Sequence, residues 1–192
     1  MKKTAVFLDR DGTINEQVGY VNHVDRIWLL PGAAKAIRKL NRLSIPAIVV
    51  SNQAGAARGY FPAVLIDHAN ERLESLLALE EAFLDDIYYC PHLPGAKVPS
   101  LDIDCSCRKP KPGMLLKAAK DHEIELEKSY MVGDRMGDIS FAHSVGCKAI
   151  LVLSGYGKGE REHIQGPEPE YVARDLYEAI LWILKDMHIY EN

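Results

Sequence analysis

Two aspartates that could hold a metal ion or react with phosphate follow a short apolar run near the start of the chain. Asp9 and Asp11 come directly after Thr4–Leu8, and Gly12 and Thr13 follow them. Such a run is typical of a strand buried on both faces, beyond whose carboxyl end α/β sheets bind ligands. Neighbouring carboxylates repel each other unless a cation lies between them, and oxygen ligands favour Mg²⁺, which commonly accompanies phosphate. The alternative is a polar turn, since Asp-Gly is a common turn dipeptide.

Later apolar runs end in side chains that complete a set suited to phosphoryl transfer. Catalysis of this reaction needs charge neutralisation and positioning above all. Asp9 could attack phosphorus, and Asp11 could protonate the leaving oxygen and then activate water. Ser51 could donate a hydrogen bond to the phosphoryl group, Lys109 could supply a positive charge, and Asp134 could add a third carboxylate for the metal.

Composition limits the class of protein. The chain has 192 residues, 47% of them apolar and 26% charged, which is ordinary for a globular protein. The net charge of −4 gives no electrostatic reason to expect nucleic acid. The first apolar run ends at Asp9, too early for a signal peptide or a membrane span. We therefore expect a cytoplasmic protein, in which disulfides are disfavoured.

Three of the four cysteines cluster with a histidine. Cys90 and His92 are separated by twelve residues from Cys105 and Cys107. Three thiols and one imidazole fit a closed tetrahedral Zn²⁺ site, which would be structural because no position remains for substrate. The alternatives are a disulfide and a chance cluster of small apolar residues. Cys147, alone before an apolar run, is expected to be a core residue.

Strand-like and helix-like patterns alternate along the chain, which predicts a parallel sheet covered by helices on both faces. We find no repeat or linker, and we expect a single domain over 1–192 with a metal-binding loop at about 90–107. Loops are expected at 14–30, facing the substrate, and at 155–170, as a mobile surface segment. The expected strands are 4–8, 47–50, 87–89, 130–132 and 149–153, and the expected helices are 31–43, 62–81, 114–120, 141–145 and 175–187.

Four motifs, in order, resemble those of the haloacid dehalogenase superfamily: Asp9–Thr13, Ser51, Lys109–Pro112 and Gly133–Asp138. The resemblance implies a Rossmann-like three-layer α/β/α sandwich and a phosphatase that forms an aspartyl phosphate. It also implies that Mg²⁺ is held by the Asp9 carboxylate, the main-chain carbonyl of Asp11 and Asp134. Asp138 would orient this site rather than bind the ion.

A second group of motifs narrows the resemblance. The cysteine–histidine cluster, Arg108–Met114, Gly19–Val21 and Ser51–Gln53 resemble the heptose bisphosphate 7-phosphatases of bacterial surface-polysaccharide synthesis, and less closely their histidinol-phosphatase relatives. These enzymes lack a large cap domain. The substrate contacts implied besides the catalytic residues are Thr13, Gln17, Val18, Gly19, Tyr20, Asn52, Gln53, Ala54, Arg108 and Arg135.

Other functions remain open from the sequence. A phosphoaccepting signalling domain also gathers aspartates, a hydroxyl, a lysine and Mg²⁺, but its reactive aspartate follows the third strand rather than the first. A zinc-dependent nucleic-acid module is disfavoured by the net acidity. Histidinol phosphate is the alternative substrate, because the same catalytic groups would serve. We expect a monomer that acts on a small phosphorylated sugar and binds neither nucleic acid nor membranes.

Overall fold

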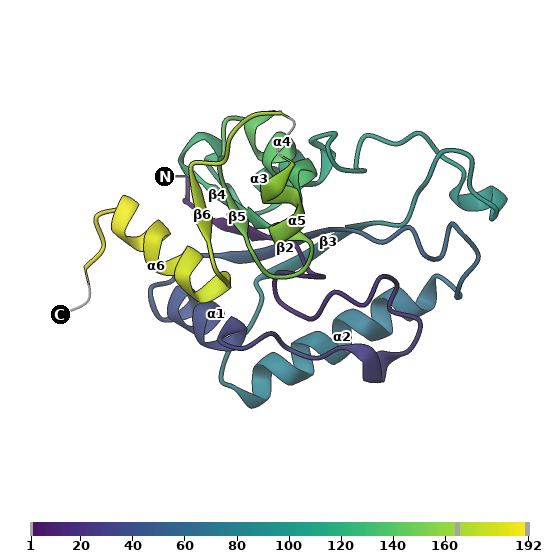
Figure 1. The fold of residues 1–192 in the computed structure, drawn as a ribbon, viewed down its shortest axis with the longest axis horizontal. Coiled ribbons are helices and arrows are strands. Elements are labelled where there is room, and N and C mark those ends of the chain that lie inside the picture. The colour runs from purple at the N-terminus through teal and green to yellow at the C-terminus, as the bar shows by residue number, and fades with distance from the viewer. Residues whose placement is uncertain (1, 164–165, 191–192) are drawn as a thin grey trace.

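The chain folds around one parallel sheet. The computed structural model describes residues 2–163 and 166–190, so Ile164 and Gln165 of the expected 155–170 loop lie outside the described residues. Six strands pair in the order β3-β2-β1-β4-β5-β6 (Figure 1). Their bounds are Val6–Leu8 for β1, Ala47–Asn52 for β2, Asp86–Cys90 for β3, Tyr130–Gly133 for β4, Lys148–Val152 for β5 and Tyr171–Ala173 for β6.

The strand order reverses beside β1. Val6 pairs with Ala47 of β2 on one side and with Tyr130 of β4 on the other. The chain builds β1 to β3 in one direction and β4 to β6 in the other, so the connections diverge between the ends of β1 and β4. Ligands of open α/β sheets bind in the crevice at such a point. Asp9 follows β1 and Asp134 follows β4, so both lie there.

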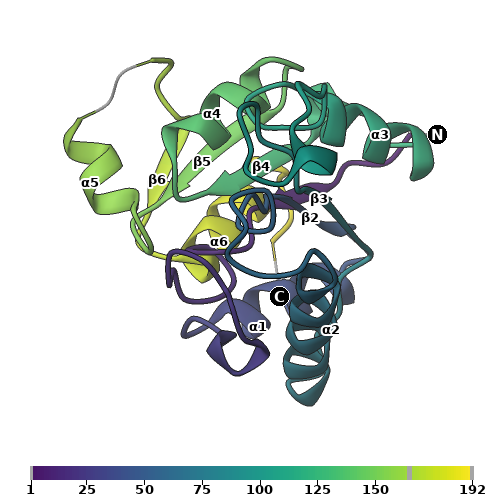
Figure 2. The ribbon, with the colours of Figure 1, turned by 90° about the vertical axis from the view of Figure 1, so that its right-hand side faces the viewer.

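Alternation along β1 sends side chains into two apolar cores. Val6 and Leu8 pack with α1 (Ala33–Arg42), α2 (Val64–Leu79) and α6 (Leu176–Asp186), whereas Phe7 packs on the opposite face with α3 (Gly113–Asp121) and α4 (Met136–His143). Figures 1 and 2 show these two helical layers with the sheet between them. The predicted three-layer α/β/α fold is confirmed. A further short helix, α5, spans Gly157–Glu162 after β5.

No cap domain is inserted at the carboxyl edge in the described part of the chain; the segments after β1 and β3 are loops that each contain one 3₁₀ turn. The segment after β1 contains the turn Val24–Arg26, and the segment after β3 contains Pro99–Leu101. A third 3₁₀ turn, Leu126–Lys128, precedes β4. In the ranges 2–163 and 166–190, no helix combines the length and apolarity needed to cross a bilayer.

Two parts of the chain differ from the expected elements. Helix α4 begins at Met136, five residues before the expected start at 141, because the Asp138 carboxylate accepts a hydrogen bond from the Arg135 amide at 3.2 Å and caps the first turn. The expected loop 155–170 contains α5, and the edge strand β6 follows it. Both added elements are short, and their sequences carry little apolar periodicity.

Candidate active site

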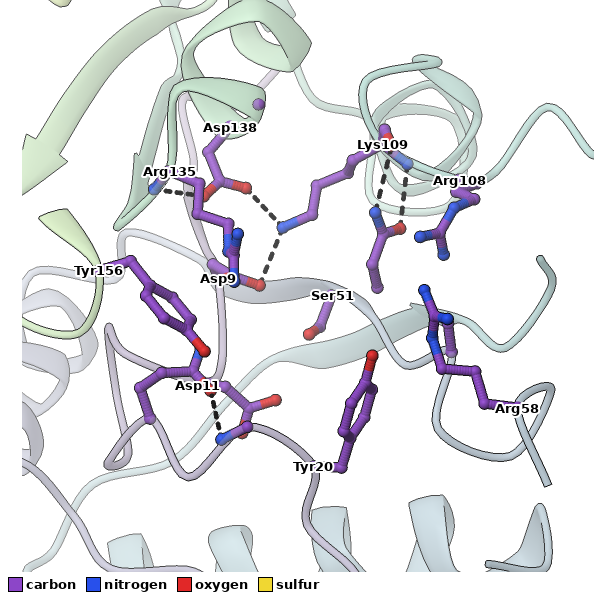
Figure 3. Close-up of a pocket in the computed structure, with 15 residues that line it drawn as sticks. Asp9, Asp11, Tyr20, Ser51, Arg58, Arg108, Lys109, Arg135, Asp138 and Tyr156 are labelled. Carbon is purple, nitrogen blue, oxygen red and sulfur yellow. Dashed lines mark hydrogen bonds and ion pairs between the residues drawn. The ribbon is translucent and has the colours of Figure 1, made fainter. Parts of the chain in front are cut away.

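A cavity of about 350 Å³ opens at the carboxyl edge of the sheet, where β1, β2 and β4 end (Figure 3). It brings together side chains that are far apart in the sequence. The expected residues that line it are Asp9, Asp11, Gln17, Gly19, Tyr20, Ser51, Asn52, Ala54, Arg108, Lys109, Arg135 and Asp138. Arg58, Gly137 and Tyr156 also line it and were not expected.

Lys109 joins two carboxylates at the base of the cavity. Its Nζ donates to Asp9 Oδ1 at 2.9 Å, to Asp138 Oδ1 at 2.6 Å and to the Val50 carbonyl at 3.0 Å. Burial alone would lower the pKa of Lys109, but Asp138 and Asp9 raise it above its ordinary value. The ammonium therefore stays charged. It lies beside Asp9, where it could neutralise the negative charge of an incoming phosphoryl oxygen.

Asp134 is a fully buried carboxylate with one unsatisfied oxygen. Its Oδ2 accepts the Tyr156 amide at 2.8 Å, whereas Oδ1 has no hydrogen-bond partner among the described residues. Burial raises its pKa to about 7, with Asp9 and Asp138 adding to the shift. One oxygen from each of these three carboxylates lies within 4.8 Å of the others. Three hard oxygen donors, one of them unpaired, fit Mg²⁺.

Asp11 is held by three buried donors. Its carboxylate accepts hydrogen bonds from Arg10 at 3.0 Å, Asn15 at 2.9 Å and Gln53 at 2.8 Å. Burial would raise the pKa of Asp11, but Arg10, Asn15 and Gln53 together hold it below the ordinary value. Arg10, only 1% exposed, also donates to Asn70 of α2 at 2.9 Å. In this structure the network favours the carboxylate form of Asp11, which can accept a proton.

Two glycines approach Asp134 closely. Gly12 has a φ of +84° and Gly155 a φ of +55°, a region that side chains disfavour. A Cβ at either position would overlap Asp134 Oδ2. The segment after β5 thus closes over the carboxylate, and Ser154 Oγ donates to the Gly12 carbonyl at 2.7 Å.

Gly155→Ala is therefore expected to displace Asp134. We expect the Mg²⁺ concentration for half-maximal activity to rise roughly tenfold or more, as for other changes that disturb a metal ligand. Gly159→Ala in α5 is the matched control, because a Cβ there meets nothing within 4 Å. Metal titrations of the two variants and the wild type are the measurement. Equal Mg²⁺ requirements for all three proteins would contradict the packing role of Gly155.

The clustered cysteines and histidine converge without forming a disulfide. The Sγ atoms of Cys90, Cys105 and Cys107 lie 3.1–3.4 Å apart, and all three cysteines are free. His92 Nδ1 is 3.5 Å from Cys107 Sγ and 3.8 Å from Cys90 Sγ. Tetrahedral Zn²⁺ would separate thiolates by about 3.8 Å and a thiolate from an imidazole nitrogen by about 3.6 Å. The S···N distances are close to this geometry and the S···S distances are about 0.4–0.7 Å shorter, so a small outward movement of the thiolates would let the four side chains hold Zn²⁺. Cys147 is buried in the apolar core, as expected.

The loop that carries this cluster also supports the cavity. Arg108 follows Cys107, and its guanidinium donates to the His92 carbonyl at 3.1 Å. Asn52, at the end of β2, exchanges two hydrogen bonds with the main chain of Lys109, at 3.0 and 3.2 Å. The positions of Arg108 and Lys109 therefore depend on this loop.

Three of the expected substrate contacts do not line the cavity. Thr13 is fully buried, and its hydroxyl has no partner in the described part of the chain. Val18 packs against the core formed with α1, α2 and α6. Gln53 donates to Ser51 Oγ at 2.9 Å as well as to Asp11, so in this structure it joins two catalytic candidates.

Several residues of the site were missed in the sequence. Arg10 lies between Asp9 and Asp11, and Asn15 lies four residues after Asp11; a cation between two carboxylates, directly after an apolar run, was the available signal for a polar network. Tyr156 was overlooked because its segment was expected to be a mobile loop; its ring lies 4.0 Å from the Arg135 guanidinium. Arg58 follows a glycine-containing turn and carried no recognisable motif.

Comparisons with known proteins agree on one enzyme class. A profile described as HAD-hydrolase-like matches residues 106–179. A D-glycero-D-manno-heptose-1,7-bisphosphate 7-phosphatase of Thermosynechococcus vestitus is 41% identical over 95% of this chain and 96% of its own. The D-glycero-β-D-manno-heptose-1,7-bisphosphate 7-phosphatase of Escherichia coli is 43% identical over 79% of this chain and 80% of its own. A crystal structure of a D,D-heptose 1,7-bisphosphate phosphatase from B. bronchiseptica, complexed with magnesium and phosphate, superposes with a TM-score of 0.86. It is 31% identical and covers 95% of this chain and 99% of its own.

Proposed function

The chain belongs to the family of D-glycero-D-manno-heptose-1,7-bisphosphate 7-phosphatases, and we propose that it removes the 7-phosphate of this sugar in the synthesis of bacterial surface polysaccharide. One observation carries the assignment to a bisphosphate. The cavity holds Asp9, Ser51 and Lys109 at its base, as one phosphate requires, and the further cation Arg108 at its rim. A sugar with two phosphates matches both positions.

The proposed chemistry has two steps. Asp9 attacks phosphorus, a bond forms between its carboxylate oxygen and phosphorus, and the bond to the sugar oxygen breaks. The negative charge of the arriving phosphate favours the protonated form of Asp11, which gives its proton to that oxygen; the resulting carboxylate then takes a proton from the water that cleaves the aspartyl phosphate and regenerates Asp9. Ser51 and Lys109 bind the phosphoryl oxygens throughout. Mg²⁺, which Asp9, Asp134 and the Asp11 carbonyl would hold, supplies further neutralisation of the phosphoryl charge.

Asp138 is proposed to orient this site rather than to bind the ion. Its carboxylate accepts hydrogen bonds from Lys109 at 2.6 Å and from the Arg135 amide at 3.2 Å. Burial raises its pKa to about 6, and Lys109 opposes the shift. These contacts fix the side chain and the lysine together, which supports a positioning role.

Arg108 is the residue through which the proposed substrate is tested. A charge-assisted contact to a phosphate contributes about 1.5–3 kcal/mol, or roughly one to two orders of magnitude in specificity. Arg108→Ala should lower kcat/KM on the heptose bisphosphate by that factor and change kcat/KM on a simple monophosphate much less. Asp9, Ser51 and Lys109 remain in place in this variant.

The measurement is the ratio of the two kcat/KM values. Lys111→Ala is the matched control: Lys111 is an exposed cation three residues along, ion-paired with Asp104 and outside the cavity. An unchanged ratio in Arg108→Ala would show that Arg108 does not read the second phosphate. Histidinol phosphate as the best substrate of the wild type would overturn the heptose assignment and leave the phosphatase chemistry intact.

We also propose that the clustered ligands hold a structural Zn²⁺. This proposal is supported by the donor set of Cys90, His92, Cys105 and Cys107, which fills all four tetrahedral positions. A cytoplasmic location is supported by the same thiols, which remain reduced and available as ligands there. The monomeric state is a further proposal, which light scattering would measure.

A further inference from the structure

Arg58 is a cation of the cavity to which neither the catalytic steps nor the motifs give a role. It lies in the turn after β2, half-buried, and lines the cavity. Its Nε is buried, and in the described ranges we find neither a hydrogen bond to its guanidinium nor an ion pair. A buried Nε without an acceptor costs free energy, and because this half-buried guanidinium lines the cavity, an anion bound in the cavity would recover that cost.

The surroundings hold Arg58 in this position. Its guanidinium carbon lies 6.0 Å from the centre of the Tyr20 ring, which in turn meets the Tyr60 ring edge-on at 4.9 Å. In the main chain, the Val98 amide of the metal-binding loop donates to the Ala57 carbonyl at 3.2 Å. The loop that carries Arg108 therefore also braces the turn that carries Arg58.

Arg58 and Arg108 point toward each other across one rim of the cavity (Figure 3). Two guanidinium groups repel each other, and an anion between them relieves the repulsion and can accept paired hydrogen bonds from each. Building on the proposed function, we propose that Arg58 is a specificity-determining residue that binds, with Arg108, the phosphate that is not hydrolysed.

Arg135, on the opposite rim, is a weaker candidate for binding the phosphate that is not hydrolysed. Arg135 is exposed there, with its guanidinium carbon over the Tyr156 ring at 4.0 Å, so it stands alone rather than facing a second guanidinium. A second reading of Arg58 is purely structural: its side chain could support Tyr20. These two roles are separated by variants that remove either the charge of Arg58 alone or its charge together with its aliphatic stem.

Three substitutions of Arg58 provide the test. Arg58→Met keeps an aliphatic stem without the charge, Arg58→Ala removes both, and Arg58→Lys keeps the charge without the planar fork. We expect Arg58→Met and Arg58→Ala to lower kcat/KM on the heptose bisphosphate roughly 10- to 100-fold, mainly through KM, and to leave kcat/KM on a monophosphate within about threefold of the wild-type value. Arg58→Lys should lose less kcat/KM on the bisphosphate than Arg58→Met or Arg58→Ala. Arg42→Ala, which removes an exposed cation before β2 at the amino edge of the sheet, is the control.

Coupling with Arg108 completes the test. If the two residues bind one phosphate, the Arg58→Met/Arg108→Ala double variant should lose less than the product of the single losses. Equal losses on both substrates, or wild-type selectivity in Arg58→Met, would overturn the proposal. A wild type that prefers another sugar bisphosphate would refute only the heptose assignment. The kcat/KM values of the Arg58 variants would then be compared on that bisphosphate and on its monophosphate. A wild type that favours no bisphosphate over its monophosphate would refute both.

Discussion

Asp9→Asn is expected to lower kcat by about four orders of magnitude or more, as removal of a covalent nucleophile generally does. The amide is a poor nucleophile, and it replaces one of the two carboxylates, Asp9 and Asp134, that are proposed to hold Mg²⁺. It also loses the ionic hydrogen bond to Lys109 at 2.9 Å. The measurement is single-turnover hydrolysis of the heptose bisphosphate at saturating Mg²⁺.

A matched control separates loss of the nucleophile from loss of structure. Asp121→Asn changes an exposed carboxylate at the end of α3 that pairs with Lys117, and it should keep wild-type activity. Rapid quenching of the wild type during turnover should trap a phosphorylated protein. Asp9→Asn treated in the same way should contain no protein-bound phosphate. Substantial turnover by Asp9→Asn, with contaminating phosphatase excluded, would refute a covalent mechanism through this residue.

Most of the sheet could be predicted because parallel strands are buried on both faces. Such strands appear as short apolar runs, and Ala47–Val50 and Tyr130–Val132 are strands in the structure, within β2 and β4. Their carboxyl ends share one edge, so polar residues following each run could be expected to meet. The sequence alone therefore predicts that Asp9, Ser51 and Asp134 lie at one edge of the sheet.

The supporting contacts could not be predicted in this way. Arg10 reaches Asn70 across 60 positions of the chain, and the Tyr156 amide reaches Asp134 across 22. No local pattern encodes such pairs, because each residue also suits a surface position. Helix α5 was missed for a related reason: it has six residues, and among them only Gly157 is buried. Tertiary packing rather than periodicity decides elements this short.

Cys107→Ser is expected to release zinc and to lower both the thermal stability and the activity of the enzyme. Zn²⁺ would close the loop between Cys90 and Cys107. Cross-linking a loop of this length contributes about 3 kcal/mol to the free energy of unfolding, which for a protein of this size corresponds to about 6–12 °C in Tm. The loop also sets Arg108, through its bond to the His92 carbonyl, and Lys109, through Asn52. Activity should therefore fall on monophosphates and bisphosphates alike, unlike in Arg108→Ala. Metal analysis should find about one Zn²⁺ per wild-type chain and much less in the variant.

Cys147→Ala is the control that isolates zinc from thiol loss. Cys147 is buried in the core beside α3 and α4, outside the cluster, and its Sγ donates to the Leu126 carbonyl at 3.0 Å. This variant should lose some stability because a buried side chain is shortened, yet it should retain its zinc and its selectivity between the two substrates. Zinc-free wild-type protein with full activity and unchanged Tm would show that the four ligands close the loop without a metal. Arg108 and Arg58 would then owe their positions to the main-chain contacts alone.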